Sequence, residues 1–229
     1  MKKLILSALI STALFSNMAF AETSPKIHHL PKHIKSYDEL IQKTTPTANL
    51  NPKSYYEFEF ELVDVPQNLE LISVNGNYWA NCWYSLHSIG IESAKPFYPS
   101  SKITINTIQK ISDNHYTVRI YDDHWQNQDY LKNGVVCEWQ LNQGEFVFAQ
   151  KDNPNHSIAV YQFNHHDYKK WLKQNHLPNA LYFDKQSYDT PSIKQHNPHT
   201  NKMVTDIKEH KPSFNVYQMR MNIKTVNLK

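Results

Sequence analysis

Hydrophobic and polar residues alternate along most of the chain between residues 55 and 163. In the clearest stretch the hydrophobic residues are Tyr56, Phe58, Phe60 and Leu62, and the residues between them are Glu57, Glu59 and Glu61. Successive side chains of a β-strand point to opposite faces, so this pattern predicts a half-exposed strand. Further strands are predicted at residues 69–74, 102–108, 115–121, 135–141, 145–150 and 157–163. Short strands separated by turn residues predict a mainly β protein, folded as an antiparallel β-sandwich or barrel.

Two of the turns between these strands are predicted from glycine. Asn75-Gly76 is a favoured two-residue hairpin turn, so residues 69–74 are expected to pair with a strand that begins at Asn77. Residues 142–144 read Asn-Gln-Gly and are expected to form a second hairpin turn, between the strands 135–141 and 145–150.

One or two short helices accompany the strands. Ser36 and Glu39 have the spacing of a capping box, which predicts a helix that runs to about Lys43. Asn164 is placed to cap a second helix, through about residue 175, in which Tyr168, Trp171 and Leu172 share one face. We expect this face to pack on the sheet.

The N-terminus has the three parts of a secretory signal peptide. Lys2 and Lys3 precede an apolar run over residues 4–15, and Ala19-Phe20-Ala21 forms a small-x-small cleavage site. The apolar run is shorter than the ~20 residues that a membrane-spanning helix needs. Cleavage near Ala21 therefore predicts a soluble mature chain that is periplasmic or secreted.

Four regions follow from these elements. Residues 1–21 are the signal peptide, and residues 22–54 are a leader with a short helix and a linker, mobile as far as Pro31. Residues 55–184 form the antiparallel β domain, including the helix near 165–175. Residues 185–229 are a lysine-rich, irregular excursion that ends in a strand at 214–226.

The two cysteines are interpreted in the light of export. An oxidising compartment favours a disulfide between Cys82 and Cys137, and two independent buried thiols are the alternative. If the segment 77–89 is a strand, Cys82 shares its face with Tyr78, Ala80, Tyr84 and Leu86. The opposite face then carries Trp79, Asn81, Trp83, Ser85 and His87.

Charge and glycine content argue against two classes of function. The formal net charge is +3, of which Lys2 and Lys3 contribute two charges, and the only arginines are Arg119 and Arg220. Arginine dominates specific recognition of bases and phosphates, so no nucleic-acid partner is predicted. The chain has four glycines and no glycine cluster that could cradle a phosphate, so no nucleotide or other cofactor is predicted.

The remaining signal is aromatic. Outward tryptophans on a rigid sheet offer a large contact area for protein recognition or for stacking on sugars. Trp79, Trp83, His87 and Trp125 are the candidate partner-binding residues, and the preferred hypothesis is a non-enzymatic binding protein with a protein partner. Its role would be that of an inhibitor, an immunity-type module or a chaperone-like module. In the alternative interpretation, the leader, the second helix or the C-terminal excursion covers these tryptophans.

Two alternative functions have weaker motifs. A hydrolase acting on the cell wall or a polysaccharide would use carboxylates such as Asp122, Asp123 and Glu138. A metal-binding protein would use histidine clusters, namely His28, His29 and His33, or His165 and His166 with Asp167. None of these clusters has two histidines four residues apart on a helix, and no local motif marks a nucleophile. No catalytic and no metal-ligating residue is therefore assigned.

Overall fold

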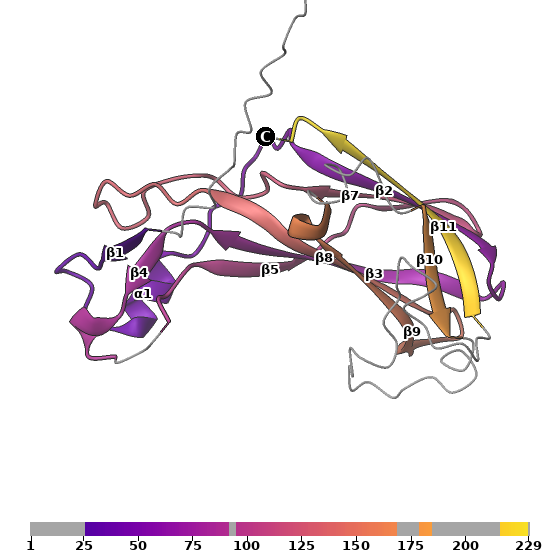
Figure 1. The fold of residues 1–229 in the computed structure, drawn as a ribbon, viewed down its shortest axis with the longest axis horizontal. Coiled ribbons are helices and arrows are strands. Elements are labelled where there is room, and N and C mark those ends of the chain that lie inside the picture. Colours follow the sequence, from indigo (N-terminus) through magenta and orange to yellow (C-terminus); the bar gives the residue numbers. More distant parts are fainter. Residues whose placement is uncertain (1–25, 92–94, 169–178, 185–215, 229) are drawn as a thin grey trace, which may run out of the picture.

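Two antiparallel β-sheets pack face to face in the computed structural model, which describes residues 26–91, 95–168, 179–184 and 216–228 (Figure 1). Within these residues each sheet ends in edge strands, so the architecture is an open sandwich. The predicted mainly β, antiparallel fold is confirmed. A smaller group of elements, which includes the first helix, lies at one end of the sandwich (Figure 1).

One layer is a five-stranded sheet. Its strands, in spatial order, are β10 (Ala180–Asp184), β11 (Val216–Val226), β2 (Tyr55–Asp64), β7 (His115–Tyr121) and β6 (Ile108–Ser112). The strand predicted at residues 214–226 corresponds to β11, which pairs with β2. Strand β10 was not predicted.

The other layer is a four-stranded sheet. Its strands, in spatial order, are β5 (Ser100–Thr104), β3 (Leu69–Ala80), β8 (Trp139–Gln150) and β9 (Asn153–Asn164). The segment 102–108, predicted as one strand, is divided between β5 at the edge of this sheet and β6 at the edge of the other.

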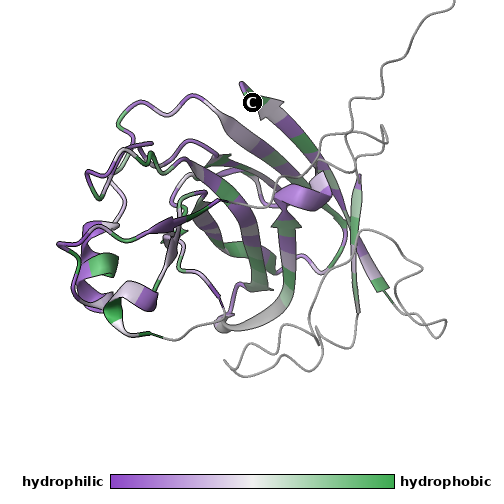
Figure 2. Ribbon diagram, turned by 60° about the vertical axis from the view of Figure 1, so that its left-hand side comes forward, coloured by the Kyte–Doolittle hydropathy of each residue, from purple (hydrophilic) through white to green (hydrophobic). Residues whose placement is uncertain are grey.

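The core between the sheets is strongly aromatic. Tyr56, Phe58 and Phe60 of β2 have no exposed surface, as their alternation with glutamates predicted. The ring centroid of Phe58 lies 4.6 Å from that of Phe146 on β8, and 4.9 Å from that of Phe163 on β9. Figure 2 shows hydrophobic and hydrophilic residues alternating along the strands. Burial of these rings is the main force that holds the two sheets together.

The two predicted glycine turns do not form. Strands β3 and β8 run without interruption through Gly76 and Gly144, which are paired with each other in the middle of the sheet. A β-carbon on Gly76 would lie 2.8 Å from the ring of Tyr78, and one on Gly144 would lie 2.9 Å from Cδ1 of Ile120 on the opposite sheet. Both glycines thus allow a close approach of side chains inside the core, rather than a change of chain direction.

The first helix and part of the leader close one end of the four-stranded sheet. Helix α1 (Tyr37–Lys43) begins where predicted, with the Ser36 hydroxyl accepting a hydrogen bond from the Glu39 amide. The leader was predicted to be mobile as far as Pro31, but its residues 27–29 form β1 (Ile27–His29), which pairs in parallel with β4 (Trp83–Ser85). The linker is also fixed, since the amide of Asn49 donates to the carbonyl oxygen of His124.

Several predictions fall on parts of the chain outside the described residues. Residues 165–168 are helical, as expected for the start of the second helix, but residues 169–175, with Trp171 and Leu172, lie outside. The signal peptide and the whole of the excursion from residue 185 to residue 213 lie outside as well. No helix among the described residues is long and apolar enough to cross a membrane.

Candidate functional site

The disulfide predicted from the sequence is confirmed, and it orients the tryptophans beside it. Cys82 and Cys137 are bonded, with their Cα atoms 4.8 Å apart, and both side chains are buried. From Val74 to Leu86 buried and less buried residues alternate without a break. Cys82 therefore points into the core, and Trp79 and Trp83 point away from it. Trp79 belongs to β3 of the four-stranded sheet, and Trp83 belongs to β4, which pairs with β1.

Tyr98 joins the two tryptophans in what we call the aromatic cluster (Trp79, Trp83 and Tyr98). The rings of Trp83 and Tyr98 are stacked at 27°, with centroids 5.1 Å apart. The ring of Trp79 meets that of Tyr98 edge-on, at 5.8 Å and 85°. Tyr98 is 39 % exposed, and both tryptophans are half-buried. The cluster thus keeps part of its aromatic surface in contact with solvent.

Backbone pairing brings Tyr98 to this position. The amide of Tyr84 donates to the carbonyl oxygen of Phe97, and the amide of Phe97 donates back to that of Tyr84. Beyond Pro99 the chain enters β5, in which Ser100 pairs with Trp79. Sequence reasoning missed Tyr98, because its proximity to Trp79 depends on the register between β3 and β5 rather than on a local motif.

A pocket of about 390 Å³ is lined by two members of the aromatic cluster and by neighbouring polar residues. Its lining includes Asn77, Trp79, Tyr98, Ser100, Lys102 and Gln143. The Asn77 amide nitrogen donates to the side-chain oxygen of Gln143 at 3.3 Å. The ammonium of Lys102, 58 % of whose side chain is exposed, lies 3.6 Å from the Glu145 carboxylate. Aromatic and polar groups that converge on one pocket are typical of ligand-binding sites.

The other two predicted partner-binding residues lie elsewhere. Trp125 packs against the core, with its ring 4.4 Å from that of His124 and 6.2 Å from that of the buried Tyr78. Because Tyr78 points to the inner face of β3, Trp125 is on the side opposite Trp79. His87 is exposed at the start of the 3₁₀ helix η1 (His87–Ile89). Only Trp79 and Trp83 of the predicted set belong to one cluster.

The carboxylates considered for hydrolysis are engaged in structural hydrogen bonds. Asp122 accepts from the amide of Leu141 at 2.9 Å. Asp123 accepts from the amides of Lys53 and Ser54, at distances between 2.8 and 3.1 Å. Glu138 accepts from the Asn81 side chain at 2.8 Å. Through these bonds Asp122 and Asp123 hold neighbouring segments of the chain in place around the core. This structural role accounts for the presence of both carboxylates.

The histidines are dispersed over the fold. His165 Nδ1 lies 2.5 Å from the hydroxyl of Tyr56, whose pKa is raised mainly by burial. His124 is half-buried, and burial lowers its pKa against the opposing effect of Asp123. No group of three or more histidine, cysteine or acidic side chains among the described residues is arranged to hold a metal ion.

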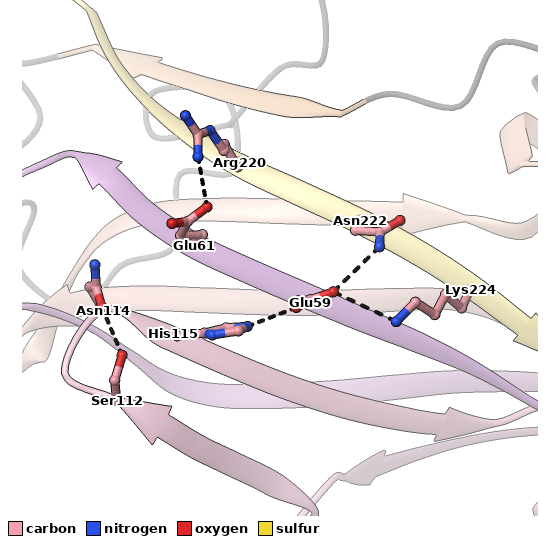
Figure 3. A network of polar contacts seen from close by, with 8 residues as sticks. All are labelled: Glu59, Glu61, Ser112, Asn114, His115, Arg220, Asn222 and Lys224. Carbon is pink, nitrogen blue, oxygen red and sulfur yellow. Dashed lines mark hydrogen bonds and ion pairs between the residues drawn. The ribbon is translucent and has the colours of Figure 1, made fainter.

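A second polar surface covers the outer face of the five-stranded sheet (Figure 3). Glu59 of β2 accepts hydrogen bonds from His115 at 2.9 Å and from Asn222 at 3.3 Å, and it lies 3.8 Å from the Lys224 ammonium. Arg220 donates to Glu61 at 3.1 Å. Partial burial alone would raise the pKa of Glu59, but these donors and charges outweigh it, so the pKa is lowered.

Replacing Glu59 by glutamine is expected to weaken the fold at neutral pH more than at acid pH. A lowered folded-state pKa means that ionised Glu59 contributes stability above the ordinary glutamate pKa of about 4.3, and that this contribution is lost as the pH falls through the folded-state value. Because the side chain is partly exposed, the loss should stay below about 1 kcal/mol. Urea unfolding of both proteins across this pH range measures the difference. An equal loss at neutral and acid pH would show that the charge is not responsible.

Comparisons with known proteins assign no family to this chain. No family model matches the sequence, and neither a curated protein nor a solved structure is significantly similar to it.

Proposed function

We propose that this chain is an exported, non-enzymatic binding protein that recognises its partner through the aromatic cluster. The observation that carries the proposal is the outward-facing stack of Trp83 on Tyr98, with Trp79 beside it, next to the buried disulfide. Aromatic side chains provide large contact areas and have few rotatable bonds, so little entropy is lost when they bind a partner.

Export supports the proposal from a different direction. Residues 1–21 have the pattern of a secretory signal peptide, and a disulfide is compatible with the periplasm or the extracellular space. We propose that the mature chain begins near Glu22 and acts in one of these compartments. Another protein is the partner class predicted from the sequence, and the experiment below tests for it.

The hydrolase alternative has less support. A catalytic acid or base must reach the bond that it cleaves. Asp122 and Asp123 instead bind backbone amides, and they lie near Tyr78 on the inner side of β3, away from the aromatic cluster. Glu138 is exposed, but it has no second carboxylate positioned beside it among its described contacts.

An affinity capture tests the proposed function. The bait is the oxidised chain from Glu22, which is incubated with periplasmic and extracellular material. The Trp79→Ala/Trp83→Ala variant is used as a second bait under the same conditions. We expect a partner that binds the wild type and is lost from the variant. Ile111→Ala is the control, because Ile111 is also an exposed hydrophobic residue (59 % against 39 % for Tyr98) but belongs to β6 of the five-stranded sheet. Circular dichroism of each bait must first show a folded protein.

Two results would contradict the proposal. A partner that binds the wild type and the tryptophan variant equally would place recognition on another surface. Turnover of a glycan or cell-wall substrate by the wild type would show that the protein is an enzyme.

A further inference from the structure

The pocket beside the aromatic cluster has walls of two chemical kinds. Trp79 and Tyr98 form one side, and because their rings are nearly perpendicular they make an aromatic corner. Asn77 and Gln143 provide side-chain amides on the other side, and Ser100 adds a hydroxyl. Amides and hydroxyls both donate and accept hydrogen bonds, so this lining suits a ligand that carries many hydroxyl groups.

The pocket is also close to electrically neutral. Lys102 is the only charged side chain among the described residues that line it, and the Glu145 carboxylate lies 3.6 Å from its ammonium. An anionic ligand would have to compete with Glu145 for Lys102. None of the described lining residues has an aliphatic side chain. Asn77 and Gln143 share one hydrogen bond, so a purely apolar ligand would cut off from water the Asn77 amide oxygen and the Gln143 amide nitrogen, which that bond does not use.

The aromatic surface extends beyond the pocket. The stack of Trp83 on Tyr98 continues it toward β4, and β5 is an edge strand of the four-stranded sheet. An elongated ligand can therefore leave the pocket along the ring of Tyr98, on the outer face of the sheet. Such a layout fits a chain of several units better than a single small molecule.

Resting on the proposed function, we propose that the aromatic cluster and its pocket bind a neutral saccharide chain. A sugar ring presents a flat face of C–H groups, which packs against an aromatic ring, and an equatorial rim of hydroxyls, which pair with amides and other hydroxyls. One ring occupies the corner between Trp79 and Tyr98, with its hydroxyls toward Asn77 and Gln143. The next ring lies toward Trp83.

Calorimetric titration of the oxidised chain with defined neutral oligosaccharides tests this proposal. The panel holds soluble tetrasaccharides of glucose, N-acetylglucosamine, mannose and galactose, in both α- and β-linkage. We expect one series to bind. Tyr98→Ala should weaken its binding at least about tenfold, the loss of a single aromatic contact of about 1.4 kcal/mol. Asn77→Ala should weaken it as well, whereas Ile111→Ala, on the other sheet, should leave it unchanged.

The possible results distinguish the saccharide proposal from the more general proposal that the aromatic cluster binds a partner. If no tetrasaccharide binds at millimolar concentration, the saccharide proposal is overturned. If a protein is then captured by the wild type and lost from Trp79→Ala/Trp83→Ala, the proposed function stands and the partner is a protein. Saccharide binding that Tyr98→Ala leaves unchanged would also overturn the proposal, because the site would lie outside the cluster. Tyr98 is exposed, so its replacement is expected to leave the fold intact.

Discussion

Replacing Cys82 and Cys137 together by alanine is expected to lower the free energy of unfolding by about 4 kcal/mol. The disulfide joins residues 55 positions apart, and a loop of this length loses about that much conformational free energy in the unfolded chain when it is closed. This is a large share of the stability of a typical domain. Guanidinium unfolding of the wild type and of the double variant measures the difference.

Chemical reduction of the wild type provides the control for this prediction. The reduced protein and the alanine variant should have similar stabilities, since both lack the same constraint. A loss well below 1 kcal/mol in both would show that the disulfide adds little to the pairing already present. That pairing is extensive, because the β3–β8 ladder continues to Ala80 and Trp139, which lie two residues before Cys82 and two residues after Cys137.

The disulfide also links stability to the candidate site. Cys82 lies between Trp79 and Trp83, and the residue after Ala80 remains attached to β8 through three hydrogen bonds between Asn81 and Glu138. Beyond Cys82 the chain enters β4, which holds Phe97 and therefore Tyr98 in place. We infer that loss of the Cys82–Cys137 disulfide loosens the stack of Trp83 on Tyr98, even if the Cys82→Ala/Cys137→Ala variant remains folded.

Local patterns were sufficient to predict much of the fold. The alternation in β2 identified which side chains are buried, because one side of the strand faces a hydrophobic core. Ser36 and Glu39 identified the start of α1, since a helix cap depends on residues three positions apart. The signal-peptide pattern at the N-terminus and an even number of cysteines were enough to predict the disulfide.

Features that depend on distant pairing were missed. The parallel pairing of β1 with β4 joins residues 27–29 to residues 83–85, and nothing local to either segment indicates it. Tyr98 reaches Trp79 only through the register of β5 on β3. The candidate site was therefore half predicted: the two tryptophans followed from alternation, whereas Tyr98 and the polar wall of the pocket required the structure.

The glycines gave a wrong prediction for a physical reason. Asn-Gly sequences favour hairpin turns because glycine tolerates positive φ, but Gly76 and Gly144 have no positive φ. They are needed instead because they have no side chain. The ring of Tyr78 lies over Gly76, and its hydroxyl donates to the carbonyl oxygen of Tyr121 at 2.7 Å on the opposite sheet. A sequence pattern does not distinguish these two uses of glycine.

Replacing Gly144 by alanine is expected to destabilise the fold by about 1–3 kcal/mol, the usual cost of overpacking a core. The new methyl group would lie 2.9 Å from Cδ1 of Ile120, a fully buried side chain on β7. Alanine also reduces the entropy of the unfolded chain, which offsets part of this cost. Urea unfolding of Gly144→Ala and the wild type gives the net effect.

A second substitution tests whether the clash is the cause. Ile120→Val removes Cδ1, the atom that the new methyl group would meet, and by itself should cost about 0.5–1.5 kcal/mol. If the two sheets meet at Gly144 as described, the double variant Gly144→Ala/Ile120→Val is more stable than the sum of the single losses predicts, by about 0.5 kcal/mol or more. Gly134→Ala is the control, because Gly134 has a φ of 82° and open space around it. The stability that this variant loses is due to backbone strain, so Ile120→Val should not restore it. Additive losses at Gly144 would show that the cost there does not come from contact with Ile120.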